Sequence, residues 1–124
     1  MEIITAALAL YLVQLLLPNG MARYMGVVDR AYLFGARDAE PKKMPETILR
    51  ARRAASNMQE SIPVFLALAV LGILQDAAMM EAAAIWLALR IIYVPLYIAG
   101  TNIWRTLVWG GSLICLIMMV VALF

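Results

Sequence analysis

Polar side chains recur at helical spacing in one stretch of this sequence, where arginine, asparagine and glutamate stand among apolar residues. At about 100° per residue, four of these side chains fall within an arc of roughly 80°, namely Arg50, Arg53, Asn57 and Glu60. Arginine binds carboxylates through two parallel hydrogen bonds and keeps its charge at physiological pH. The stripe therefore has the chemistry to bind a small anionic molecule.

A second stripe combines a guanidinium group with two phenols. Arg90, Tyr93 and Tyr97 lie within roughly 60° of one another on a helix. Arg105 follows a few residues later in the chain. If the two stripes face each other, the groups between them are rich in hydrogen-bond donors.

Glu60 and Arg90 are ionisable residues inside apolar segments, where such residues are costly and often functional. With a rise of about 1.5 Å per residue, both lie on the order of 10 to 14 Å from the same membrane surface, so they can meet. A purely structural alternative stays open, in which the two pin a pair of helices and the basic residues near position 50 anchor to lipid headgroups. More polar groups converge than one ion pair requires, and we therefore favour a cleft for an anionic ligand.

Four apolar segments must position these stripes. Of the 124 residues, 65% are hydrophobic and only 15% are charged, a composition suited to lipid rather than to water. A transmembrane helix needs about 20 mostly apolar residues. Segments that approach or meet this length cover residues 3–28, 54–75, 82–99 and 106–124. Because the connections at 76–81 and 100–102 are short, adjacent helices are expected to run antiparallel.

The sequence thus predicts a single all-α domain over residues 1–124, an integral membrane four-helix bundle with up-down-up-down topology. The expected helices cover about residues 2–29, 46–75, 80–99 and 103–124, and a loop covers about 30–45.

The orientation of the bundle follows from the distribution of lysine and arginine, which favour cytoplasmic loops. The turn at 76–81 carries only acidic charges, whereas residues 18–55 carry eight basic side chains. These are Arg23, Arg30, Arg37, Lys42, Lys43, Arg50, Arg52 and Arg53. We therefore expect the first loop and the turn before Arg105 to be cytoplasmic, with both chain termini on the opposite side.

Composition also excludes several classes of function. The absence of histidine excludes Ser/His/Asp and Cys/His catalysis and histidine-containing metal sites, and we expect no metal. A net charge of +2 without basic runs argues against nucleic-acid binding. A proton-coupled drug antiporter is disfavoured because the first span has no carboxylate between Ile3 and Val28. Cys115, inside an apolar run, is expected to be a core residue.

The order and spacing of these residues resemble a known family. The pattern Arg50-x-x-Arg53-Ala54-x-x-Asn57-x-x-Glu60-x-x-Pro63 is followed by Arg90-x-x-Tyr93-x-x-x-Tyr97 and by Arg105. It resembles the signature of the MAPEG family, the membrane-associated proteins in eicosanoid and glutathione metabolism, and looks most like the short bacterial members. The resemblance implies a homotrimer in the bacterial inner membrane that binds glutathione, as a co-substrate, in clefts between subunits open to the cytoplasm.

The resemblance also implies roles for single residues. Arg53, Asn57 and Glu60 would bind the carboxylates and amine of glutathione, and Tyr93 and Tyr97 would line the cleft from the adjacent chain. Arg105 would be the catalytic residue that stabilises the thiolate. Arg23 or Arg30 would match the arginine near the end of the family's first helix. The expected glutathione-binding residues are thus Arg30, Arg50, Arg53, Asn57, Glu60, Arg90, Tyr93 and Tyr97.

Two functions are consistent with this pattern. The first is a membrane glutathione transferase, with glutathione peroxidase activity as an extension, in which the thiolate attacks lipophilic electrophiles arriving from the bilayer and so detoxifies them. A thiol with a pKa of about 8.5 is mostly protonated at neutral pH, and an adjacent cation raises its nucleophilic fraction. The second is a non-catalytic lipid-binding or scaffold protein with the same trimeric fold.

Overall fold

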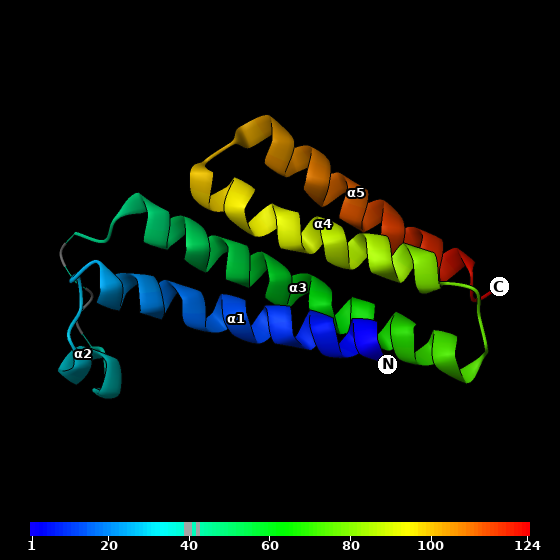
Figure 1. Cartoon of the computed structure of the whole chain (residues 1–124), viewed down its shortest axis with the longest axis horizontal. Helices are drawn as coiled ribbons and strands as arrows, with labels where there is room; N and C mark the ends of the chain where they lie inside the picture. Colours follow the sequence, from blue (N-terminus) through cyan, green and yellow to red (C-terminus); the bar gives the residue numbers. More distant parts are fainter. Residues whose placement is uncertain (39–40, 42) are drawn as a thin grey trace.

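The computed structural model describes residues 1–38, 41 and 43–124. Within this part of the chain the protein forms four long helices and one short helix (Figure 1). They are α1 (Glu2–Tyr24), α2 (Arg30–Phe34), α3 (Glu46–Leu74), α4 (Met80–Ala99) and α5 (Asn102–Val121). The prediction of an all-α fold is confirmed. Lys42, one of the basic residues behind the expected orientation, lies outside the described residues.

The four long helices pack as an antiparallel bundle in which α1 contacts α3, α3 contacts α4, and α4 contacts α5 (Figure 1). Both chain termini lie at one end of the bundle. The other end holds α2, the start of α3 and the turn between α4 and α5, and we call it the basic end because most of the arginines lie there. The expected up-down-up-down arrangement is therefore present.

All four long helices are long and apolar enough to cross a membrane. Their outer faces expose large hydrophobic side chains, such as Leu16 on α1, Ile91 on α4 and Leu107 on α5. In water such faces would be unfavourable, whereas lipid is their natural solvent. The chain is an integral, multi-pass membrane protein.

The core lies where α3 packs against α1, α4 and α5. Phe65 of α3 and Trp86 of α4 are fully buried and stack with ring centroids 3.9 Å apart. Small residues let the backbones approach closely, as lipid provides no hydrophobic force between helices. At Gly72 the approach is so close that a Cβ atom would collide with the side chain of Met79.

The first helix ends earlier than the sequence predicts. α1 stops at Tyr24, and Gly26 adopts a positive φ of 70°, which a helix cannot accommodate. Asp29 then starts α2, because its carboxylate accepts a hydrogen bond from the backbone N–H of Tyr32 at 2.7 Å. Part of the expected loop over 30–45 is therefore a short helix, and the end of the expected first helix is a turn.

Candidate functional site

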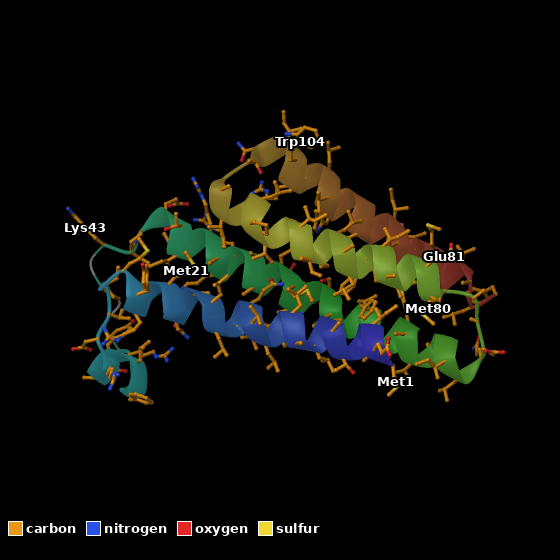
Figure 2. The ribbon with its side chains drawn as sticks, in the orientation of Figure 1. Met1, Met21, Lys43, Met80, Glu81 and Trp104 are labelled. Atoms are coloured by element: carbon orange, nitrogen blue, oxygen red, sulfur yellow. The ribbon has the colours of Figure 1, made fainter. Side chains whose placement is uncertain are left out.

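A small pocket opens between α3, α4 and α5 toward the basic end. Its volume is about 200 Å³, and its lining is Asn57, Tyr93, Tyr97, Arg105, Thr106 and Trp109. In Figure 2, Trp104 and Lys43 mark the basic end, while Met1 and Glu81 mark the opposite end. Four of the residues expected to form the site thus line one pocket.

The two tyrosines connect the buried part of the pocket to Arg105. Tyr93 and Tyr97 meet edge to face, with ring centroids 5.4 Å apart. The guanidinium carbon of Arg105 lies 4.7 Å from the ring centroid of Tyr97. An arginine over an aromatic face is held by attraction to the ring's electrons, and this fixes the cation without neutralising it. Arg105 can therefore offer its charge to an anion in the pocket.

Within the single chain, Tyr93 and Tyr97 line the same pocket as Asn57. The physical reason is that α4 packs directly against α3, which brings the inner faces of both helices to one pocket. The expectation that the adjacent chain supplies the tyrosines of a cleft between subunits stays a prediction.

Arg90 lies behind the pocket rather than in its lining. Its side chain is 3% exposed, and Nη1 donates a hydrogen bond of 2.6 Å to Oδ1 of Asn57. The guanidinium carbon also lies 5.5 Å from the centroid of the Trp86 ring and 5.6 Å from that of Tyr93. Among the described residues no carboxylate pairs with Arg90. The ion pair with Glu60 that the sequence allowed does not form, because Asn57 faces α4 instead.

Arg50 and Arg53 share one carboxylate near the start of α3. Arg53 Nη1 lies 3.1 Å from Oε1 of Glu46, and Arg50 Nε lies 3.8 Å from the same atom. Arg50 also donates from Nη1 to the backbone carbonyl of Ile98 at 3.4 Å. Arg50 therefore ties the start of α3 to the end of α4, and neither arginine lines the pocket.

Glu60 and Arg30 lie away from the pocket in different ways. Glu60 is exposed on α3, near enough to Tyr93 for an electrostatic interaction. Arg30 is exposed at the start of α2. This short helix packs through Tyr32 and Leu33 near the end of α1 and the beginning of α3. The single chain thus brings Asn57, Arg90, Tyr93, Tyr97 and Arg105 together and leaves Arg30, Arg50, Arg53 and Glu60 outside the pocket lining.

Two pocket residues were not singled out from the sequence as site residues. Thr106 directly follows Arg105, and Trp109 comes four residues after it. Residues four apart lie on one helix face, so Arg105 itself pointed to Trp109.

Two larger cavities lie outside this site. One, of about 390 Å³, lies between α1, α2 and α3 and is lined in part by Asn19, Tyr32 and Arg37. The other, of about 500 Å³, lies at the end of the bundle with the termini, and Glu2 and Asp76 are the ionisable side chains among its described lining residues. Neither contains a residue of the expected site, so volume alone does not indicate the functional centre.

Fold and site together define a class: a four-helix integral membrane protein with an arginine, two tyrosines and an asparagine around a pocket near one end. The model of the MAPEG family matches residues 3–124, and the chain belongs to this family. The family includes glutathione transferases and peroxidases as well as non-catalytic members. No match was found among curated proteins.

Proposed function

We propose that the protein is a membrane glutathione transferase that adds glutathione to lipophilic electrophiles dissolved in the bilayer. The observation that carries this proposal is the position of Arg105, whose cation shares a pocket with Asn57, Tyr93 and Tyr97. The described lining contains no carboxylate that would neutralise the cation. Membership of a family that includes glutathione-using enzymes supports the same reading.

The proposed chemistry is nucleophilic substitution or addition by a thiolate. Arg105 favours loss of the glutathione thiol proton to solvent, because the cation stabilises the anionic sulfur. The sulfur then forms a bond to the electrophilic carbon, and the electron pair leaves with a departing anion or is quenched by a proton. Asn57, Arg53 and Glu60 bind the polar ends of the tripeptide, and Tyr93 and Tyr97 hold it beside Arg105.

We further propose that glutathione lies in a cleft completed by a neighbouring copy in a homotrimer. The pocket of about 200 Å³ in one chain is smaller than the range of about 300–1,000 Å³ common for small-molecule sites. Arg53 and Glu60 are exposed beside it, where a ligand between two copies could reach them. Arg30, which lies away from the pocket of its own chain, would then contribute from the neighbour.

The basic end is proposed to face the cytoplasm, because lysine and arginine favour that side. A cysteine placed at the exposed Lys43 should react with a membrane-impermeant thiol reagent only after cells are opened. Reaction in intact cells would contradict this orientation.

Conjugation of glutathione to chlorodinitrobenzene tests the activity directly, since the sulfur–carbon bond forms as chloride departs. We expect Arg105→Ala to lower kcat/KM at neutral pH by at least about tenfold, because the thiolate loses its cation. The deficit should shrink as the pH rises past about 8.5, where the thiol ionises without help. Lys43→Ala, which removes an exposed cation from the same end, is the matched control.

A non-catalytic lipid-binding protein would behave differently in the same assay. It would show no conjugation and no rise in thermal stability when glutathione is added to the detergent-solubilised protein, because only a bound ligand shifts the unfolding equilibrium. That combination would contradict the proposed function.

A further inference from the structure

Asn57 has two different ends, and the structure shows which of them Arg90 occupies. Nη1 of Arg90 lies 2.6 Å from Oδ1 of Asn57. A guanidinium group has only donors, so the atom that it meets must be the carbonyl oxygen of the amide and not the nitrogen. The orientation of the Asn57 amide is therefore fixed by chemistry.

The other end of the amide is unused. No hydrogen bond donated by Nδ2 of Asn57 occurs within the described residues, and Asn57 lines the pocket. Its partner Arg90 is 3% exposed and is held between the rings of Trp86 and Tyr93. A rigid, buried donor on one side leaves the amide nitrogen as the atom offered to a ligand.

We infer that Arg90 is a positioning residue, which turns the Asn57 amide so that the pocket presents an N–H donor to an acceptor oxygen of the bound ligand. The inference rests on the proposed function, in which that oxygen belongs to a carboxylate or peptide carbonyl of glutathione. It assigns Arg90 a role through Asn57 and not the direct contact with glutathione expected from the sequence.

The rest of the pocket agrees with a ligand that accepts hydrogen bonds. Arg105 can only donate. The hydroxyl of Thr106 does not add to this set of donors, because its proton is already donated within its own helix, to the carbonyl of Asn102 at 2.9 Å. If the Asn57 amide were reversed, its carbonyl would face the ligand's oxygen and repel it, and the amide nitrogen would face the cation of Arg90.

The energetics separate positioning from simple structural support. A buried cation without a carboxylate partner is costly in a membrane interior, and an apolar residue of similar size removes that cost. The Asn57 oxygen that loses its donor belongs to a residue lining the pocket, where water can replace the lost hydrogen bond. Arg90→Met should therefore not weaken the fold, whereas it should release the amide of Asn57. A residue that only supported the fold would show the opposite pattern.

The test measures glutathione affinity by calorimetry and thermal stability in detergent for a set of variants. Asn57→Asp keeps a partner for Arg90 but removes the donor, so we expect at least about tenfold weaker binding without loss of stability. Arg90→Met should weaken binding about three- to tenfold, raising KM for glutathione while kcat stays within about twofold. Arg90→Lys, which still donates to Oδ1, should restore most of the affinity.

The double variant Arg90→Met/Asn57→Ala gives the decisive comparison, because alanine removes the amide without adding a charge. We expect it to bind glutathione no more weakly than Asn57→Ala alone, since Arg90 acts only through the amide that is already gone. Gln14→Leu, which changes a buried polar residue on α1 outside the pocket, is the control and should leave affinity unchanged.

The outcomes distinguish the inference from the proposed function. If the wild-type protein binds no glutathione, the proposed function and the inference both fail. If it binds and Arg90→Met binds equally well, the inference alone is overturned. Independent, additive losses in the double variant would also overturn it, since they would indicate direct contact between Arg90 and the ligand.

Discussion

At the scale of single residues, three arginines of the predicted site have different environments. Arg105 is held over a ring, Arg90 is buried against an amide, and Arg53 meets Glu46. The spacing in the sequence placed Arg53 and Arg90 on polar helix faces, but spacing alone does not say which partner each arginine contacts. The pairing of Arg90 with Asn57 depends on how α3 and α4 are rotated against each other, and this is set by packing around Phe65 and Trp86.

Glu46 competes with a ligand carboxylate for Arg53. The contact of 3.1 Å between them is largely exposed to solvent and is therefore worth at most about 1 kcal/mol. We expect Glu46→Gln to strengthen glutathione binding by up to about fivefold, with the gain reduced at high salt. Glu2→Gln, which changes an exposed carboxylate at the other end of the bundle, is the control in the same calorimetric titration. Weaker binding by Glu46→Gln would show that Arg53 needs Glu46 to be positioned.

At the scale of elements, the apolar segments predicted the four spans, because a bilayer admits few other structures. The end of α1 was missed although the signals were present: Gly26 permits the positive φ, and Asp29 is a favourable residue at a helix start. The mostly apolar residues at 24–28 instead favoured a longer first helix than the structure has. The junction of α3 with the α4–α5 turn could not be predicted, since it depends on Arg50 meeting a backbone carbonyl far along the chain.

Gly100, in the turn between α4 and α5, is a position where an added side chain should destabilise the fold. It ends α4 with φ 78°, and a Cβ atom there would lie 2.5 Å from Nη1 of Arg50. We expect Gly100→Ala to lower the free energy of unfolding by about 1–2 kcal/mol from the backbone strain, and by more if Arg50 cannot move. Chemical unfolding in detergent measures this loss.

Gly110 provides a matched control for that substitution. It lies within α5, and a Cβ atom there would meet nothing within 4 Å. Gly110→Ala should therefore be neutral or slightly stabilising, because alanine favours the helix. Equal losses for the two variants would contradict the account of the α4–α5 turn.

At the scale of the whole molecule, most of the arginines and the candidate site lie toward one end of a bundle whose outer faces are apolar. Composition predicted the membrane setting, and the fold confirms a four-helix bundle. The trimer stays a prediction, because a helix surface that is apolar on every side does not reveal which face meets a partner.

The proposed trimer predicts a defined mass and a shared site. Native mass spectrometry from detergent should give three copies of the 13.7 kDa chain. If Arg30 of one chain completes the pocket of another, mixing Arg30→Ala chains with Arg105→Ala chains should give more activity at neutral pH than either variant has alone. A monomer, or no recovery on mixing, would contradict the shared cleft.

The central claim is that Arg105 holds glutathione as a thiolate, and ultraviolet absorbance of the thiolate tests it most directly. Titrating the purified protein with glutathione at neutral pH should produce a saturable thiolate signal that Arg105→Ala loses and Lys43→Ala retains. The Arg105→Ala protein should still bind glutathione by calorimetry. A wild-type protein that binds glutathione without any thiolate signal, or an Arg105→Ala variant with an undiminished signal, would contradict the account.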